Sequence, residues 1–239
     1  MDILAGSCSA ETKEEIFKQA KFVSDNNLYA LRLMLWKPRT NKESFQGIGE
    51  EGIEIAKEIA SIYPTMRFVT EVMDNSHVDL LTESGLDFMY QIGARNCQNY
   101  GLLKYLGKLK GKRILFKRGF STTIDEYINA AEYLEPELND VWLCLRGIRT
   151  FDDCMRNTPD IGALLVLKDM FEYDKRFMIG FDPSHATGKR KFIKPFFDIC
   201  KTCGCDFVEI EIHSSPDEAW SDSSQTVSFD ALKEMMNEG

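Results

Sequence analysis

Long hydrophobic runs are missing from this sequence. No window approaches the roughly 20 apolar residues that a membrane helix needs, which excludes a membrane-spanning helix. The start, Met1 to Ser7, lacks a basic region and a long apolar stretch, so we expect no signal peptide. The seven cysteines cannot all pair, and several lie in apolar runs, which favours free thiols in a reducing compartment. The sequence therefore predicts a soluble, cytoplasmic protein.

Basic residues are also in short supply. The chain has 29 Lys and Arg against 38 Asp and Glu, a formal net charge of −9. That sign argues against nucleic acid or an anionic membrane as a partner, because their phosphates attract positive charge. The 239 residues are 44% hydrophobic and 28% charged, which is an ordinary globular balance with ample length for a core. A basic pocket inside an acidic protein stays compatible with this composition.

Short apolar runs alternate with stretches of helical spacing along the whole chain. The predicted strands are residues 3–5, 30–35, 67–71, 88–92, 114–117, 141–145, 177–181 and 207–211. The predicted helices are residues 10–26, 49–62, 77–83, 98–106, 123–134, 160–171, 189–203 and 228–237. Eight such units of about 30 residues approach the ~250 residues typical of a (β/α)₈ barrel, and no G-x-G-x-x-G turn supports a doubly wound sheet. We predict an α/β fold, a TIM barrel, with residues 1–239 as one catalytic domain.

Cationic side chains gather where predicted strands end, which is where barrel enzymes carry their chemistry. They are Arg32, Lys37, Arg39, Arg95, Lys117 and Arg146. Arg32 and Lys117 interrupt or end apolar runs, which is unusual for solvated loop charges. So many like charges repel one another unless anions neutralise them, and their number suits more than one phosphate or carboxylate. The alternative is that each cation pairs with a neighbouring carboxylate.

A second set of strand-end residues offers metal ligands of mixed chemistry. Its members are Cys8, His185, Glu211 and Asp222, after the first, seventh and eighth predicted strands. A thiolate, an imidazole and two carboxylates suit a borderline divalent ion such as Mn, Fe, Co or Zn. In a closed barrel these three strands are neighbours, which would bring the ligands together. His213 is an alternative to His185, because alternation keeps it on the strand face of Glu211.

Structural roles are the alternative interpretation for these residues. Cys8 would then be a small buried residue, His185 a turn histidine and Asp222 a helix cap. The run Cys200-x₂-Cys203-x-Cys205 has the spacing of half a zinc site, but no partner pair occurs elsewhere. We expect those three thiols to be structural.

The strand-end strings resemble those of the 3-deoxy-D-arabino-heptulosonate 7-phosphate (DAHP) synthases, in the branch that shares its core with the 3-deoxy-D-manno-octulosonate 8-phosphate (KDO8P) synthases. The matching strings are KPRT (37–40), SFQG (44–47), TEVMD (70–74), QIGARN (91–96), KRG (117–119), RGIRT (146–150), RNT (156–158), DPSHATG (182–188), EIH (211–213) and SD (221–222). The resemblance implies an enzyme that condenses phosphoenolpyruvate (PEP) with an aldose phosphate and releases phosphate. The KPRT string implies erythrose 4-phosphate and the first step of the shikimate pathway, because the octulosonate branch typically carries an Asn-Arg form there.

The resemblance also implies roles for individual residues. The metal ligands would be Cys8, His185, Glu211 and Asp222, with Mn favoured among Mn, Fe, Co and Zn. The PEP pocket would consist of Arg32, Lys37, Arg95, Lys117 and Arg146. The phosphate of erythrose 4-phosphate would be held by Arg39 and Thr40. The predicted catalytic set is Lys37, Cys8 and His185, with Lys37 as a hypothetical proton donor to the new alkoxide. Relatives form dimers or tetramers, so we expect a homo-oligomer.

Three features depart from the family pattern. Ser7 stands where the family usually has proline in a Gly-Pro-Cys turn, which predicts a looser turn before Cys8. Leu145 precedes Arg146 where relatives commonly have glutamate. The chain begins almost at the first strand, so we expect no regulatory extension and no feedback control by aromatic amino acids.

Two other functions stay open at this point. One is KDO8P synthesis from arabinose 5-phosphate, which the Lys37–Thr40 string disfavours. The other is a barrel that binds a phosphorylated ligand without catalysis. The full set of cations and candidate ligands disfavours the second function, because an inactive barrel would be free to lose some of them.

Overall fold

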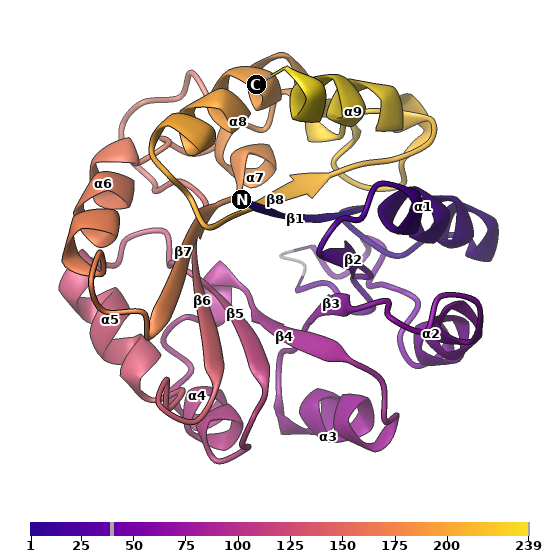
Figure 1. Cartoon of the computed structure of the whole chain (residues 1–239), viewed down its shortest axis with the longest axis horizontal. Helices are drawn as coiled ribbons and strands as arrows, with labels where there is room; N and C mark the ends of the chain where they lie inside the picture. Colours follow the sequence, from indigo (N-terminus) through magenta and orange to yellow (C-terminus); the bar gives the residue numbers. More distant parts are fainter. Residues whose placement is uncertain (39–40, 239) are drawn as a thin grey trace.

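Eight parallel strands close into a barrel, each paired with its neighbours in chain order and β8 paired with β1. A computed structural model of the chain describes residues 1–38 and 41–238. The strands are β1 (Asp2–Gly6), β2 (Ala30–Arg32), β3 (Phe68–Glu71), β4 (Phe88–Ile92), β5 (Arg113–Lys117), β6 (Asp140–Leu145), β7 (Phe177–Phe181) and β8 (Phe207–Glu211). Figure 1 shows the closed ring from one end of the barrel.

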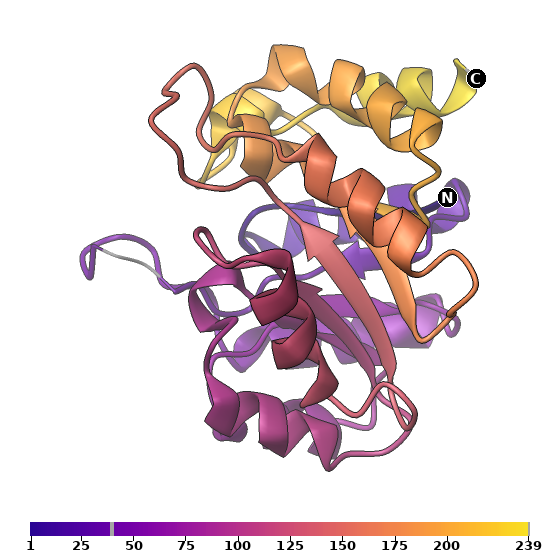
Figure 2. The ribbon, with the colours of Figure 1, turned by 90° about the vertical axis from the view of Figure 1, so that its left-hand side faces the viewer.

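Helices surround the strands, as the side view in Figure 2 shows. They are α1 (Lys13–Asp25), α2 (Glu51–Ile62), α3 (Asn75–Glu83), α4 (Tyr100–Gly107), α5 (Ile124–Glu132), α6 (Ile161–Met170), α7 (Pro183–Thr187), α8 (Ile193–Thr202) and α9 (Phe229–Asn237). No helix among the described residues combines the length and hydrophobicity needed to cross a membrane. The prediction of a TIM barrel is confirmed.

Apolar side chains fill two layers of this barrel. Inside the ring of strands lie Leu4, Met34, Val69, Leu115 and Trp142, all nearly inaccessible to solvent. A larger cluster packs the outer faces of the strands against the helices. Because both faces of every strand are covered, the strands read as continuous apolar runs in the sequence. A charged residue within such a run therefore points either into the barrel or toward its carboxyl-terminal mouth.

The predicted elements differ from the observed ones mainly at their ends. The second strand was expected over residues 30–35 but ends at Arg32. Beyond that point the chain leaves the regular ladder, and the amide of Leu35 donates to the hydroxyl of Thr70 instead of to a backbone carbonyl. The segment around His185, for which no helix was predicted, is the short helix α7. Pro183 begins this helix, the Asp182 side chain caps it and Gly188 ends it in the left-handed conformation.

The pairing of β1 with β8 sets up the functional end of the barrel. Gly6 lies opposite Glu211 in the register, so the loop after β1 starts beside the end of β8. A Cβ atom on Gly6 would lie 2.1 Å from the carbonyl oxygen of Arg32, which is closer than real Cβ atoms come. Glycine at this position lets β1 and β2 approach, and Cys8 then follows two residues above the strand.

Candidate active site

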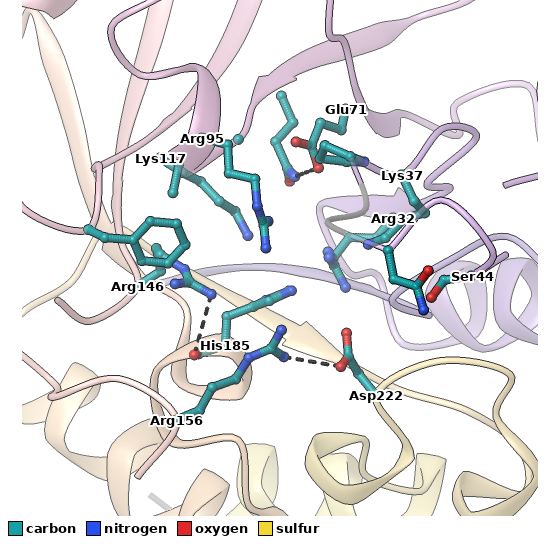
Figure 3. A pocket seen from close by; sticks show the side chains of 16 residues that line it. Arg32, Lys37, Ser44, Glu71, Arg95, Lys117, Arg146, Arg156, His185 and Asp222 are labelled. Carbon is teal, nitrogen blue, oxygen red and sulfur yellow. Dashed lines mark hydrogen bonds and ion pairs between the residues drawn. The ribbon is translucent and has the colours of Figure 1, made fainter. Parts of the chain in front are cut away.

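One pocket opens at the carboxyl ends of the strands, and most of the predicted cations line it. The lining includes Arg32, Lys37, Arg95, Lys117, Arg146 and Arg156, with His185 and Asp222 at one side. Figure 3 shows the side chains of Arg95, Lys117 and Arg146 directed into the same cavity. Arg39 and Thr40 lie outside the described residues, although their neighbours Pro38 and Asn41 line the pocket.

Two of the cations are held at the base of the pocket by buried carboxylates. Lys117 Nζ lies 2.6 Å from Asp182 Oδ2 and 2.9 Å from Glu209 Oε2. Arg32 Nε donates to the other oxygen of Glu209, and Arg32 Nη1 lies 3.6 Å from Glu211 Oε1. All five side chains are at least 95% buried. The alternative interpretation, in which the cations pair with carboxylates, is therefore correct for these two cations, and the carboxylates are the buried side chains of Glu209 and Glu211 in β8 and of Asp182, directly after β7.

The buried carboxylates keep both cations charged. Burial alone would lower the pKa of Arg32, but Glu209 and Glu211 raise it above its usual value. The same balance holds for Lys117, where burial opposes the charge while Asp182 and Glu209 raise the pKa. Both side chains therefore present fixed positive charge to the pocket at neutral pH.

Arg95 and Arg146 are placed differently, because no carboxylate among the described residues forms an ion pair with either side chain. Arg146 is 5% exposed, and its Nη1 atom has no hydrogen-bond partner in the described part of the chain. Burial, together with the positive charges of the neighbouring Arg156 and Arg95, lowers the pKa of Arg146 to about 10. The attraction of Asp182 opposes this shift. At neutral pH the guanidinium is charged and lacks a counterion, which makes it a receptor for an anion.

The four predicted ligands meet at the side of this pocket. Cys8, His185, Glu211 and Asp222 each offer a ligand atom, and these atoms all lie within 4.8 Å of one another. The Cys8 thiol donates to Asp222 Oδ2 at 2.7 Å, and His185 Nε2 lies 3.3 Å from Glu211 Oε1. The strands thus bring together the residues that the sequence placed on three different loops.

Asp182 fixes the orientation of the histidine in this cluster. Its Oδ2 atom lies 2.7 Å from His185 Nδ1, and its Oδ1 atom accepts the backbone amide of His185 at 2.9 Å. Burial lowers the pKa of His185, against the opposing effects of Asp182 and Glu211. The imidazole is then neutral, with the proton on Nδ1 and Nε2 free for a metal ion. Asp182 stands in one of the matching strings, DPSHATG, but its role in orienting His185 was not predicted from the sequence.

The cluster fits a divalent metal ion by its chemistry and by one unsatisfied atom. Glu211 Oε2 accepts a hydrogen bond from Gln225 at 2.6 Å, whereas Oε1 is buried without a hydrogen-bond partner in the described structure. A buried carboxylate oxygen without a donor is costly, and a cation at this place would satisfy it. One thiol, one imidazole and two carboxylates are a ligand set that Mn, Fe, Co and Zn accept.

The pKa values of the Cys8 thiol and the Asp222 carboxyl group are shifted in opposite directions. Burial, with the nearby Glu211, raises the pKa of Cys8 to about 12. Burial also opposes ionisation of Asp222, yet Arg156 and the Cys8 thiol lower the pKa of Asp222 to about 2. Arg156 Nη1 lies 3.1 Å from Asp222 Oδ1, and this ion pair was not predicted from the sequence. Asp222 has a φ of 53°, a conformation that aspartate tolerates better than most residues.

Lys37 lies between the ligand cluster and the cation pocket. Its Nζ atom donates to the carbonyl oxygen of Cys8 and lies 3.1 Å from Cys8 Sγ. The side chain lines the pocket although the residue is only 8% exposed. Lys37 therefore contacts a residue of the ligand cluster and also lines the cation pocket.

Ser7 is held firmly, so the structure does not support the expected loosening of the turn before Cys8. The Ser7 amide donates to Gln19 Oε1 at 3.0 Å, and Gln19 Nε2 donates to the Ser7 hydroxyl at 2.5 Å. Gln19 also donates to Glu15 Oε1 at 2.9 Å. A proline at position 7 would lack the amide proton, so the serine here makes a link from the turn to α1 that proline cannot make.

His213 is engaged elsewhere, which favours His185 as the histidine of the cluster. His213 Nε2 lies 3.2 Å from Glu11 Oε2, and its Nδ1 atom accepts the amide of Ser215 at 2.9 Å. Both ring nitrogens therefore have partners outside the pocket.

Glu71, the last residue of a predicted strand, also lines the pocket, and a Cβ atom on Gly93 would lie 1.9 Å from Glu71 Oε1. Glycine at position 93 thus leaves room for this carboxylate.

Known proteins resemble this chain over its whole length. The family model described as "DAHP synthetase I family" matches residues 1–239. A phospho-2-dehydro-3-deoxyheptonate aldolase of Thermotoga maritima is 38% identical over 237 residues, covering 99% of this chain and 68% of that protein. A 2-dehydro-3-deoxyphosphooctonate aldolase of Campylobacter jejuni subsp. doylei is 24% identical over 266 residues, covering 99% of this chain and 96% of that protein.

Solved structures agree with this result. The crystal structure of the Thermotoga maritima DAHP synthase has a TM-score of 0.87 at 37% identity, covering 100% of this chain and 68% of that one. A truncated form of the enzyme from the same organism has a TM-score of 0.85 at 35% identity, covering 100% and 84%. The full-length match to the family model, together with 38% identity to a curated relative, shows that this chain belongs to the DAHP synthetase I family.

Proposed function

We propose that this chain is a metal-dependent DAHP synthase, which condenses PEP with erythrose 4-phosphate and water to give DAHP and inorganic phosphate. The observation that carries the proposal is the position of the uncompensated cations Arg95 and Arg146 in the same pocket as the Cys8, His185, Glu211 and Asp222 cluster. The family supports the reaction type. The product enters aromatic amino acid biosynthesis at the first step of the shikimate pathway.

The cations would bind PEP and align it for attack. PEP carries a carboxylate and a phosphate, and the pocket offers Arg32, Lys117, Arg95 and Arg146 as donors. Carbon 3 of PEP forms a bond to the aldehyde carbon of the sugar, water adds at carbon 2, and the carbon–oxygen bond to phosphate breaks in a later step. Fixed positive charge favours these reaction steps, because it holds the carboxylate and the phosphate of PEP in a near-attack arrangement.

The cluster of Cys8, His185, Glu211 and Asp222 would hold the divalent ion, with Mn favoured over Fe, Co and Zn. When bound, the ion would supply Lewis acidity to the aldehyde oxygen. Asp182 would keep His185 in the correct tautomer, and Arg156 would hold Asp222. Removal of the thiol tests this assignment directly, because Cys8→Ser should lose Mn²⁺ affinity measured by calorimetry while Cys203→Ser, outside the pocket, should retain it.

Lys37 would give a proton to the alkoxide that forms on the sugar. Its Nζ atom is 3.1 Å from Cys8 Sγ and so lies at the edge of the ligand cluster. Lys37→Met should therefore lower kcat far more than it weakens PEP binding, because the proton is needed after binding. Lys42→Met is the matched control, since the Lys42 side chain is 91% exposed. Equal losses in turnover and PEP affinity would contradict the proton-donor role.

The sugar would be selected by the loop after β2. We propose that Arg39 and Thr40, together with Asn41 and Ser44, which line the pocket, hold the phosphate of erythrose 4-phosphate. The resemblance to octonate aldolases makes arabinose 5-phosphate the alternative sugar. Substrate choice separates the two functions without further structural work.

The deciding experiment is phosphate release from PEP by metal-stripped protein. Erythrose 4-phosphate and arabinose 5-phosphate are each supplied with and without Mn²⁺. Release only with erythrose 4-phosphate and Mn²⁺ supports the proposal in full. Release with the five-carbon sugar instead assigns the chain to KDO8P synthesis, and no release under several metals would make it a binding protein.

We also propose that the protein is a cytoplasmic homo-oligomer, a dimer or a tetramer. The outer face of α6 supports an interface, because Leu165, Val166 and Met170 are each about half exposed on a helix with few polar residues. Light scattering after size exclusion measures the mass in solution. Leu165→Glu should lower that mass if α6 forms the contact, and an unchanged oligomer would exclude α6 from it.

A further inference from the structure

Phe120 stands beside three guanidinium groups at the mouth of the barrel. The guanidinium carbons of Arg146 and Arg149 each lie 4.6 Å from the centre of its ring, and that of Arg95 lies at 5.7 Å. None of these three arginines forms an ion pair with a carboxylate in the described part of the chain. An aromatic face carries negative potential, so the ring attracts each of the three cations.

The ring lies in the wall between two hollows. Phe120 lines the main pocket together with Arg95 and Arg146, and it also lines a neighbouring groove together with Arg95 and Arg149. Arg146 is buried and Arg149 is exposed, so the ring contacts a cation in each hollow. Figure 3 shows Arg95 and Arg146 directed toward the cavity that the substrate would fill.

The backbone around Phe120 is held in a fixed position by its neighbours. Arg118 Nη2 donates to the carbonyl oxygen of Thr122 at 2.7 Å, and Arg118 Nη1 lies 2.9 Å from Asp160 Oδ2. A Cβ atom on Gly119 would lie 2.3 Å from Cys97 Sγ, so only glycine allows this close approach. The carbonyl oxygen of Phe120 itself accepts the amide of Arg149 at 2.9 Å. These contacts fix the backbone from which the ring extends toward the arginines.

We propose that Phe120 is a positioning residue that holds Arg95 and Arg146 in place for the anionic groups of PEP. Before an anion binds, Arg146 has only a long hydrogen bond of 3.5 Å to the carbonyl oxygen of His185, and one of its buried nitrogens has no partner among the described residues. Like charges would otherwise drive Arg95 and Arg146 apart. The ring offsets this repulsion without supplying a carboxylate, which would compete with the substrate for the same donors.

This inference rests on the proposed function only for the identity of the anion. Loss of the ring should weaken anion binding more than it changes the sugar and metal sites, because the ring contacts Arg95, Arg146 and Arg149, none of which is among the four candidate metal ligands. Cation–π interactions of desolvated groups predict that Phe120→Leu weakens PEP binding about tenfold to thirtyfold. Phe120→Tyr keeps the aromatic face and should bind PEP within about twofold of the parent protein.

The test measures binding and kinetics side by side on the full chain. Calorimetric titration with PEP, and separately with inorganic phosphate, compares the parent, Phe120→Leu, Phe120→Tyr and a control, Tyr133→Leu. Tyr133 is a suitable control because its ring also faces a cation, with Lys104 Nζ 5.3 Å from the ring centre. The residue is 41% exposed and lies outside the pocket. Steady-state kinetics should show a raised KM for PEP in Phe120→Leu, with kcat and the KM for erythrose 4-phosphate nearly unchanged.

Several results would overturn the positioning role. Unchanged affinity for both anions in Phe120→Leu would do so, as would equal losses in Phe120→Leu and Phe120→Tyr. Parallel changes in both KM values with a lower melting temperature would indicate a merely structural role. If the parent protein releases no phosphate from PEP but Phe120→Leu still binds inorganic phosphate more weakly, the proposed function fails and the positioning role of Phe120 stands.

Discussion

Replacing Glu209 by glutamine tests whether the base of the active site is held together by buried charge. Glu209 is 1% exposed, and each of its carboxylate oxygens accepts from a different cation, one from Arg32 and one from Lys117. Glutamine has the same shape but only one oxygen, so its NH₂ group must face one of the two cations. The substitution therefore leaves a buried donor opposite another donor.

The expected cost follows from this geometry. Removing one partner of a buried ion pair typically costs about 3–5 kcal/mol, because the remaining charge stays buried without compensation. Lys117 keeps Asp182 at 2.6 Å and Arg32 keeps the more distant Glu211 at 3.6 Å, which places the expected loss near the lower limit, at about 3 kcal/mol. For a chain of this size, that loss corresponds to a fall of about 6–12 °C in the melting temperature.

Urea unfolding and thermal unfolding of Glu209→Gln give the measurement, with Glu58→Gln as the control. Glu58 pairs with Lys13 at 2.6 Å, but both side chains are more than half exposed, so the control should lose less than about 1 kcal/mol. A loss in Glu209→Gln no larger than that of the control would refute the reasoning. It would show that the carboxylate is dispensable and that Arg32 and Lys117 are held by other contacts.

Two further substitutions probe local contacts. Ser7→Pro removes the amide proton and the hydroxyl that hold Gln19, so the free energy of unfolding should fall by about 1–3 kcal/mol, against about 1 kcal/mol for Ser7→Ala. Urea denaturation decides, and equal losses would contradict the role of the amide. Asp74→Ala removes the cap of α3 and should cost about 1 kcal/mol. The hydrogen bond from Ser76 lowers the pKa of Asp74 below its ordinary 3.8. The stability lost in Asp74→Ala should therefore be constant above about pH 4 and shrink as the pH falls through the lowered pKa of the folded state. A loss that grows in acid would contradict the assignment.

The barrel could be predicted from the sequence because the strands are short, largely apolar runs of three to six residues in a regular alternation with helices. Burial on both faces of a parallel sheet produces such runs directly. Element ends were less predictable, since the end of β2 depends on a hydrogen bond from Leu35 to the side chain of Thr70 across strands. The helix after Asp182 was read as a loop because it has only one turn.

The candidate site was predictable where residue type alone indicates chemistry. Arg32 and Lys117 stand out because they interrupt or end apolar runs, which is unusual for solvated loop charges. Glu209 and Phe120 were missed for opposite reasons. Glu209 lies two residues before Glu211, and the alternation rule applied to His213 would also have placed it on the same face. Phe120 follows a glycine and reads as a core residue, and nothing in the sequence indicates that its ring lies against Arg95, Arg146 and Arg149.

We propose that residues other than the buried strand residues determine which sugar phosphate the enzyme accepts. Relatives that match 99% of this chain are named both as heptonate and as octonate aldolases, so the proposed function has to account for the choice between two sugars. PEP is common to the two proposed reactions, and the strand residues Arg32 and Lys117 would serve it in both. The two sugars differ by one carbon between the aldehyde and the phosphate. An enzyme that holds the aldehyde in one place must therefore choose between the two sugars by the place at which it holds the phosphate, and Asn41 and Ser44, which line the pocket, are the described residues that we propose for this contact.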